Sequence, residues 1–311
     1  MDEMDILKFS KSSQIPENLV KFMNFKIEGI MVYTNFYWSR INFLTNESDY
    51  RTPQQYFYSK EEDIHADYPE EPPKENHIVP DYLEGCLKMS EELKKLFRMK
   101  TCSFTLLMLQ KEPEEMIEIL SRMLANKCTS ICITAALFVE GQNSIEQVID
   151  GKVLDYLMES MGFDGQLIFN GLFPENYYHE NLFKFRDFIH NNASWVTMEM
   201  LKSLRNAGNF TFFSLNFTSE DINNFIHFWM NCEEDMMESI KIDIKQDNNF
   251  IEADVLDQLV TLDYFDSKQN RSYRLIKARK TKNRTHILAI FFTRFSGIRD
   301  DFENFNLQKY V

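Results

Sequence analysis

Two cysteines in this sequence have a spacing that could serve metal binding. Cys128 and Cys132 are separated by three residues, as two thiolate ligands of a zinc site can be. Such a site needs further cysteine or histidine ligands, and no second cysteine pair accompanies this one. Cys132 lies within the strand-like segment "TSICITA", and Cys128 precedes it. We therefore interpret both as structural thiols, and we predict no metal and no cofactor.

A second group has the residue types of a hydrolytic triad. Ser219, Asp221 and His227 lie within "SEDINNFIH". However, Thr218 or Ser219 suits the cap of a helix, and Asp221 suits its positively polarised first turn. No phosphate-binding loop, nucleophile elbow or zinc-protease motif occurs elsewhere. The sequence therefore predicts a protein that is not an enzyme. A pocket joining two of the dispersed histidines to carboxylates would favour the remote alternative, an enzyme of unknown chemistry.

The composition indicates a folded, acidic protein. Apolar residues make up 44% of the 311 residues and aromatic residues 14%, which is enough for a substantial core. The nine glycines are few for this length, which argues against glycine-rich phosphate loops. The net charge is -14, and such a chain repels nucleic acid and anionic membranes unless its basic residues cluster. We expect neither nucleic acid nor a membrane among its partners.

Cysteine usage and the first residues favour a reducing, cytoplasmic environment. The five cysteines are an odd set, and the chain has neither an apolar signal segment nor an apolar run of about 18 residues. The basic segment Arg271–Arg284 could serve as a nuclear-import signal or as a docking patch for an acidic partner. A solvated hairpin with charged edges also explains this segment, and we favour that interpretation.

From residue 80 onward, short strand-like segments alternate with amphipathic helical ones. Strands are predicted to begin near residues 102, 129, 165, 210 and 238. Helical segments follow, including 180–189 and 197–204, and the helix after Thr218 places Ile222, Phe225, Ile226 and Trp229 on one face. One strand and one helix per unit is the organisation of leucine-rich repeats, whose strands stack in parallel over a shared core.

The ends of the chain depart from this pattern. Residues 24–45 predict an antiparallel hairpin, an acidic loop with three prolines follows over 59–77, and "SYRLIKA" and "THILAIFFTRF" predict antiparallel capping strands. The predicted fold is α/β: an irregular leucine-rich-repeat-like solenoid with a mainly parallel sheet, plus small antiparallel β elements at both ends. Its expected divisions are a polar tail (1–22), the hairpin and loop (23–79), the repeat region (80–250) and the capping strands (251–311).

Strand alternation predicts which side chains face away from the helices. If Leu167, Phe213 and Ile240 point inward, their neighbours point outward. The outward row is polar with a few apolar residues, as a protein-binding sheet face is, although a face without a partner would have the same composition. The candidate partner-binding residues in this row are Thr134, Ile168, Asn170, Phe212, Ser214, Asn216, Lys241 and Asp243.

A longer pattern runs from Trp195 to Ile244. It begins with "WVT" and a leucine helix, continues through a strand into "DINNFIHFW", and ends in the alternating segment "SIKIDI". In this order and spacing the segment resembles the nematode type 2 F-box-associated domain, and the similarity extends over most of residues 20–295. The resemblance implies no catalytic residues. Its pattern positions Trp195, Asp221, Phe225 and Trp229 are expected to be structural.

The resemblance implies a substrate receptor of a cullin-type SCF ubiquitin ligase. In that family an N-terminal F-box binds a Skp-type adaptor, and the C-terminal domain captures the target. Residues 1–22 offer too little helix for an F-box, so we expect this chain to lack one. We therefore predict a non-enzymatic module that binds an unidentified protein on its sheet face. The alternative is a ligase receptor that contacts the Skp-type adaptor through a divergent F-box or without one.

Overall fold

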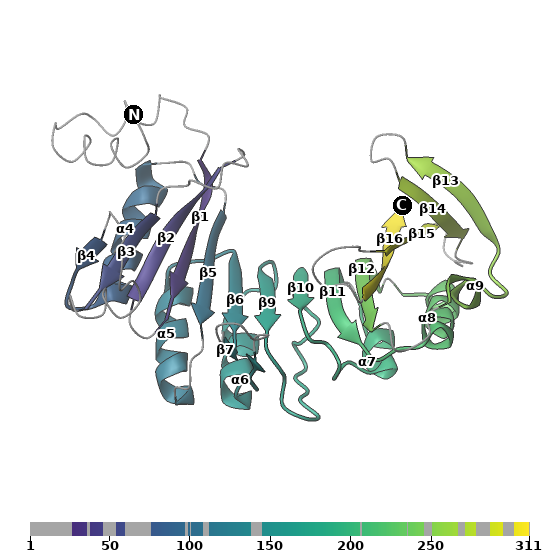
Figure 1. Cartoon of the computed structure of the whole chain (residues 1–311), viewed down its shortest axis with the longest axis horizontal. Coiled ribbons are helices and arrows are strands. Elements are labelled where there is room, and N and C mark those ends of the chain that lie inside the picture. Colours follow the sequence, from purple (N-terminus) through teal and green to yellow (C-terminus); the bar gives the residue numbers. More distant parts are fainter. Residues whose placement is uncertain are drawn as a thin grey trace. The chain divides into compact units, whose positions relative to one another are not determined.

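The computed structural model divides the chain into two compact units, residues 1–146 and 147–311, a division that falls inside the predicted repeat region 80–250 (Figure 1). Both units are α/β, with parallel strands, antiparallel strands and helices. No helix within the described residues is both long and apolar enough to cross a bilayer. The residues described are 27–35, 38–45, 54–59, 76–96, 99, 101–107, 112–137, 145–205, 207–234, 236–245, 251–266, 271–277, 287–294 and 302–310.

In its described part, the N-terminal unit has a sheet with the strand order β6-β5-β1-β2-β3-β4. Strands β1, β2 and β3 are antiparallel neighbours, which confirms the hairpin predicted over 24–45, whereas β1, β5 and β6 are parallel. The predicted loop 59–77 lies mostly outside the described residues, and β4 begins at its end. The strands are β1 (Ile27–Thr34), β2 (Trp38–Thr45), β3 (Gln54–Tyr58), β4 (Asn76–Ile78), β5 (Thr101–Leu107) and β6 (Ser130–Thr134), with a separate antiparallel pair β7 (Ala136–Leu137) and β8 (Ile145–Glu146).

Two helices belong to this unit, α4 (Tyr82–Leu96) and α5 (Pro113–Ala125). The sequence of α5 favours a helix, since Pro113 suits a first helical turn and the apolar residues share one face. Its buried residues are Met116, Leu120 and Met123. Helix α4 contacts strands β1, β2 and β3. Helix α4 lies within the region from residue 80 onward in which strands and helices were predicted to alternate.

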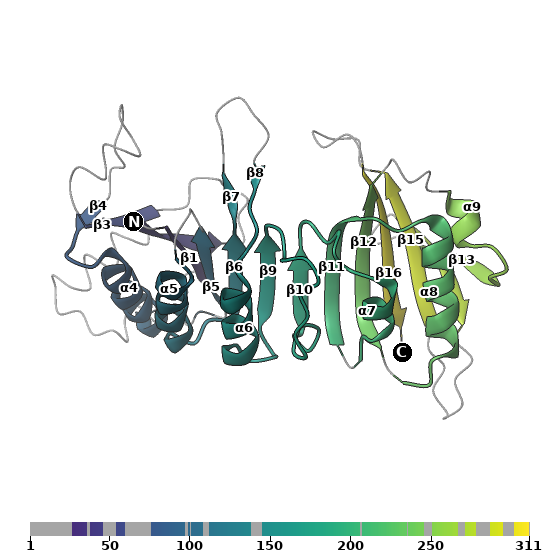
Figure 2. The same ribbon diagram turned by 90° about the horizontal axis from the view of Figure 1, so that it is seen from below.

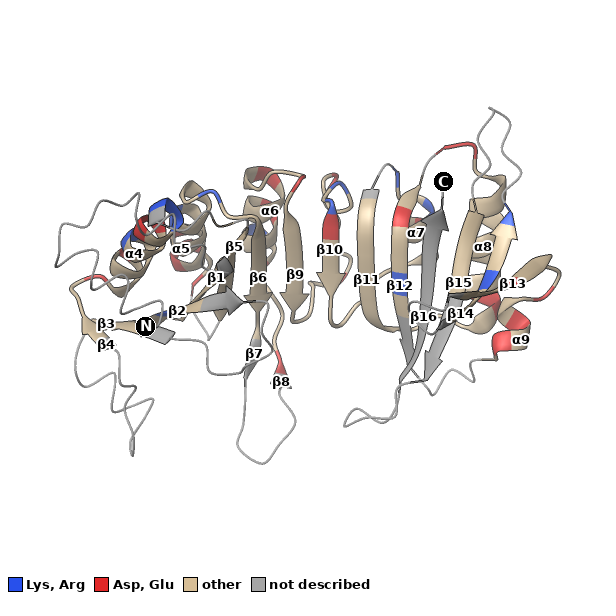
Figure 3. Ribbon diagram, turned by 90° about the horizontal axis from the view of Figure 1, so that it is seen from above, with Lys and Arg blue, Asp and Glu red and all other residues tan. Residues whose placement is uncertain are grey.

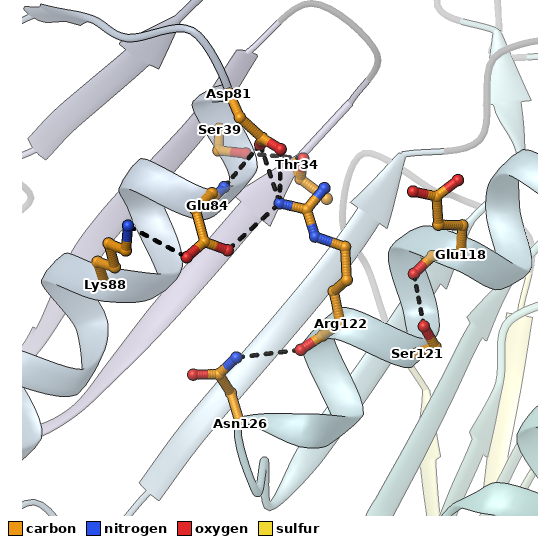
Figure 4. A network of polar contacts seen from close by, with 9 residues as sticks. All are labelled: Thr34, Ser39, Asp81, Glu84, Lys88, Glu118, Ser121, Arg122 and Asn126. Carbon is orange, nitrogen blue, oxygen red and sulfur yellow. Dashed lines mark hydrogen bonds and ion pairs between the residues drawn. The ribbon is translucent and has the colours of Figure 1, made fainter.

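An ion-pair network joins α5 to the start of α4 (Figure 4). Arg122 Nη2 donates to both carboxylate oxygens of Asp81 at 2.9 Å and lies 3.5 Å from Glu84 Oε2. Partial burial tends to raise the pKa of Asp81, but hydrogen bonds from Arg122 and the backbone N–H of Glu84 outweigh it and hold this pKa below its usual value. Because these side chains remain partly solvated, the network orients the helices more than it stabilises them.

In its described part, the C-terminal unit has a sheet with the strand order β13-β14-β15-β16-β12-β11-β10-β9. Strands β9 to β12 are parallel neighbours in the order of the sequence. Beyond β12, the strands β16, β15, β14 and β13 follow in that order, and each is antiparallel to its neighbour. The antiparallel character predicted for the C-terminal strands is confirmed. The strands are β9 (Gln166–Asn170), β10 (Asp187–His190), β11 (Ala207–Leu215), β12 (Met237–Lys245), β13 (Thr261–Asp266), β14 (Arg271–Lys277), β15 (Ile287–Arg294) and β16 (Phe302–Tyr310).

The helices of this unit gather on one side of the parallel strands. Figures 2 and 3 view the structure from opposite directions, and in both α6, α7 and α8 lie on the same side of β9–β12. The side chains buried beneath them are mainly aromatic, including Phe169, Phe188, Phe210, Phe212 and Phe225. The helices are α6 (Gly151–Ser160), α7 (Met198–Lys202), α8 (Ser219–Asn231) and α9 (Glu252–Val255).

The prediction of a helix over residues 180–189 is wrong. Residues 180–186 form turns, and β10 begins at Asp187. Within β10, Phe188 and His190 are buried while Asp187 and Ile189 are half-buried, which is the period of a strand. The segment pairs in parallel with β9 on one side and β11 on the other. Its backbone groups are therefore satisfied by two neighbours that are distant in sequence, and this overrides local helix preference.

Helix α8 begins and packs as predicted. Thr218 Oγ1 accepts the backbone N–H of Asp221 at 3.2 Å, and Asp221 Oδ2 accepts that of Thr218 at 2.8 Å, which completes a capping box. Ile222, Phe225, Ile226 and Trp229 are buried on one face. Asp221, Phe225 and Trp229 are therefore cap and core residues.

We expect Trp229→Ala to lower the free energy of unfolding by about 3–5 kcal/mol, because it removes a large side chain that is only 2% exposed. Urea unfolding followed by circular dichroism would measure this change. Asn224→Ala, at an exposed position of the same helix, is the matched control and should cost less than about 0.5 kcal/mol. Equal losses for the two variants would contradict the packing described for α8.

Candidate functional site

The face of strands β9–β12 opposite the helices carries side chains that are half-buried, and no described helix covers it (Figure 3). We call this surface the open face. Parallel pairing places its side chains in rows that cross the four strands. Its members are Gln166, Ile168, Asn170, Asp187, Ile189, Asn209, Thr211, Phe213, Ser239 and Lys241.

The first row of the open face is a chain of hydrogen bonds. Asn209 Nδ2 donates to Asp187 Oδ1 at 2.8 Å, and Ser239 Oγ donates to Asn209 Oδ1 at 2.5 Å. Gln166 stands in register with Asp187 on β9. Because Asp187, Asn209 and Ser239 are held by these hydrogen bonds, their side chains lose little conformational freedom when another molecule binds them. The row therefore offers fixed hydrogen-bonding groups on the open face.

The next two rows add apolar area and a positive charge. Ile168, Ile189, Thr211 and Lys241 are in register across the second row. Lys241 Nζ lies 5.1 Å from the centroid of the Phe213 ring, within the range of a cation–π contact. A surface that combines an aromatic ring, aliphatic side chains and a cation beside fixed polar groups resembles the mixed surfaces of protein interfaces.

A glycine allows the first row to form at the start of β11. The backbone N–H of Asn209 donates to the carbonyl oxygen of Arg186 at 2.6 Å. A Cβ at the preceding residue, Gly208, would lie 1.9 Å from that same oxygen. Only glycine allows the backbone at residue 208 to approach the backbone at Arg186 this closely, so Gly208 positions Asn209 beside Asp187.

Several candidate partner-binding residues lie on the open face, as predicted. Ile168, Asn170 and Lys241 are half-buried and alternate with the buried residues of β9 and β12. Asn216 follows β11 in an exposed position, with its Nδ2 3.5 Å from the carbonyl oxygen of Ser194. That any of them binds a partner stays a prediction.

Two other candidates fall elsewhere. Thr134 belongs to the N-terminal unit and is buried, so it is no member of the open face. Asp243 lies within β12, but its side chain is outside the part of the chain that the structure describes.

Phe212 was placed on the wrong face by strict alternation. Its side chain is fully buried, whereas Phe213, which was predicted to point inward, lies on the open face. The register of β11 with β12 shifts between Phe212 and Leu215. Ser214 adopts a φ of 62°, the left-handed conformation of a β-bulge residue, which lets Phe212 and Leu215 both point inward. The candidate Ser214 is therefore the bulge residue of β11.

The sequence interpretation missed Gln166, Asp187, Ile189, Asn209, Thr211 and Ser239. Asp187 and Ile189 were assigned to a helix, so their strand was not counted. Asn209 and Ser239 carried a usable signal, because both stand near the starts of predicted strands, where registered polar residues can form a row.

His190 lies in an aromatic cluster beneath the open face. Its ring centroid is 4.4 Å from that of Phe173 and 5.4 Å from that of Trp195. The backbone N–H of Asn192 is 3.1 Å from Nδ1, and the indole N–H of Trp195 is 3.2 Å from Nε2. A protonated imidazole would direct N–H groups at both donors, and it would be charged in an apolar site. Burial lowers the pKa of His190 to about 3, so the ring is neutral.

Two members of the triad-type group, Ser219 and Asp221, have structural partners, and so does His179. Ser219 Oγ accepts the backbone N–H of Ile251 at 2.7 Å, and Asp221 belongs to the capping box. His179 Nδ1 accepts the backbone N–H of Asn181 at 3.1 Å. Among the described residues, no group of three or more His, Cys, Asp or Glu side chains is arranged to hold a metal ion.

All five cysteines are free thiols. Cys86 and Cys102 are buried in the N-terminal unit, where burial raises the pKa of both thiols. Burial likewise raises the pKa of Cys128 to about 11. Thiols with raised pKa values contain little thiolate at neutral pH and react slowly, in agreement with a structural role.

Comparisons of the chain with protein-family models, with curated proteins and with solved structures found no match.

The burial of His190 predicts a loss of stability in mild acid. The unfolded imidazole takes up a proton as the pH falls through about 6.5, whereas the native ring stays neutral until the pH approaches 3. In this interval stability falls with decreasing pH by at most about 1.4 kcal/mol per pH unit, or about 2 kcal/mol between pH 7.5 and pH 5.

Urea unfolding of the wild type and of His190→Gln at both pH values would test this. The glutamine keeps a hydrogen-bond acceptor but does not titrate, so the difference between the two pH values should shrink by about 2 kcal/mol. His227→Gln, at a half-buried position of α8, is the control. An unchanged pH dependence in His190→Gln would contradict a neutral, buried ring.

Proposed function

We propose that this chain is a non-enzymatic protein-interaction module that binds a protein partner on the open face. The observation that carries the proposal is the registered polar row of Asp187, Asn209 and Ser239 beside Phe213 and Lys241. Fixed hydrogen-bonding groups give specificity at low entropic cost, and the neighbouring apolar side chains supply area that a partner can bury. The resemblance of residues 195–244 to F-box-associated domains agrees with this role.

We further propose that the parallel strands form part of a leucine-rich-repeat-like solenoid. In support, β9 to β12 follow one another in sequence order with their helices on one side. Asparagines also stand at or just after the ends of β9, β10 and β11, namely Asn170, Asn191 and Asn216. Asn191 Nδ2 donates to Asn170 Oδ1, which links two successive strand ends. Such repetition from unit to unit is typical of solenoids.

The alternative function is that of a substrate receptor in a cullin-type SCF ubiquitin ligase. This alternative needs contact with a Skp-type adaptor, through a divergent F-box or without one. The F-box-associated resemblance favours this class of complex. The open face would then hold the target protein of the ligase.

The test is affinity capture of the tagged chain from nematode extract, followed by quantitative mass spectrometry. Phe213→Ala with Lys241→Ala removes the aromatic ring and the cation from the open face without entering the core. Asn224→Ala with Asn231→Ala changes two exposed residues of α8 and is the control. We expect at least one captured protein to fall by about tenfold with the first pair, as loss of about 1.4 kcal/mol requires, and to persist with the second.

The outcomes separate the two functions. If every captured protein persists with the open-face pair, the proposed binding surface is wrong. Recovery of a Skp-type adaptor with the wild type supports the receptor function, and its absence beside a retained partner supports an independent module.

A further inference from the structure

Strand β13 forms an edge of the C-terminal sheet and is unusually apolar for an edge. Among the described strands it pairs with β14 alone. Leu262 is 68% exposed, Tyr264 52% and Phe265 57%, and the preceding Val260 is 89% exposed. Edge strands of soluble proteins usually carry charges, prolines or a covering segment that prevents further pairing. Exposed aromatic and aliphatic side chains on an accessible edge favour the addition of another strand.

A cavity of about 440 Å³ adjoins this edge. Its walls come from α9, β13, β14 and β15. They are formed by Glu252, Asp263, Tyr264, Phe265, Ser272, Tyr273, Arg274 and Ile290. Tyr264 and Phe265 both line this space and are exposed, so a side chain entering it would bury part of their apolar surface.

Hydrogen bonds hold the segment that leads into β13 in place without a partner. Asn223 of α8 donates from Nδ2 to the carbonyl oxygens of Val255 and Asp257 at 2.9 and 2.8 Å. The backbone N–H of Ile251 donates to Ser219 Oγ at 2.7 Å. These bonds tie α9, which leads into β13, to the capped start of α8. An edge held in this way needs little ordering when a strand is added.

The charge beside the edge determines the kind of partner. Between Lys245 and Lys268 the sequence contains no basic residue. The acidic residues of this interval are Asp247, Glu252, Asp254, Asp257, Asp263 and Asp266. Asp263 forms an ion pair with Arg274 of β14, while Glu252, Asp254 and Asp257 are exposed on and just after α9. A second copy of this chain that paired through its own β13 would bring the same acidic residues against them, and such pairing is disfavoured.

We propose that β13 accepts an extended segment of another protein as an added strand, and that this segment alternates apolar residues with Lys or Arg. The backbone of the segment pairs with the edge of β13. Its apolar side chains pack against Leu262 and Tyr264, which share one face of β13, and its cations lie near the acidic residues of α9. This site is separate from the open face, and it does not depend on the function proposed there.

The probe is a fluorescent peptide library with members about eight residues long, a length suited to one strand. Lys or Arg is fixed at alternate positions, and Val, Ile, Leu, Phe or Tyr varies between them. Anisotropy titrations with the full chain should identify binders. We expect charge reversal to Glu to weaken binding at least about tenfold. N-methylation of one alternate set of backbone amides should weaken it similarly, whereas methylation of the other set should not, because a strand pairs through one edge only.

Leu262→Lys with Tyr264→Lys changes two exposed side chains and adds cations, so it should abolish peptide binding without unfolding the chain. The open-face pair Phe213→Ala with Lys241→Ala is the control and should bind the peptide as the wild type does.

Three results would overturn the proposal. The first is that no library member binds, and the second is that both methylated sets bind like the parent peptide. The third is light scattering that shows a dimer which the Leu262→Lys and Tyr264→Lys pair dissociates, because β13 would then pair with a second copy. Loss of peptide binding in the open-face control would instead assign the peptide to the other surface.

Discussion

The aromatic layer beneath strands β9–β11 determines which side chains the C-terminal unit can present to other molecules. Phe169, Phe188 and Phe210 must all point toward the helices, since each is fully or almost fully buried. With the pleat fixed by these rings, the alternate residues can only point the other way. The open face is therefore a consequence of core packing. A substitution that shifted the register of one strand would exchange its core and surface side chains.

The sequence predicted the parts of the fold that rest on local patterns. Helix α8 was predicted from its cap and from four apolar residues on one face, and the β1–β2 hairpin from two β-rich segments. Strand β10 was missed because its four residues become a strand only between β9 and β11, which are distant in sequence. Phe212 was misplaced for a different reason: a bulge at Ser214 interrupts alternation, and no glycine marks it.

The same distinction applies to the candidate surface. Ile168 and Lys241 could be placed because their strands are regular, so a period of two assigns their faces. The hydrogen bonds among Asp187, Asn209 and Ser239 could not be foreseen, since they require the register of three strands. Such a row is a tertiary property, although each residue type is compatible with it. The edge at β13, with exposed apolar side chains beside acidic residues, could not be predicted either. A strand can be recognised as an edge only when the strand order of the sheet is known.

The buried thiols of the N-terminal unit make covalent labelling of this unit a measure of its opening. Cys86 is fully buried in α4, which packs on the sheet, and burial suppresses its thiolate form. An alkylating reagent can therefore react with Cys86 only after α4 separates from the strands, however reactive the reagent is. Cys232, which is half-buried in the C-terminal unit, carries no such requirement. The labelling rate of Cys86, divided by that of Cys232 as the reference, would then measure how often the N-terminal unit opens locally.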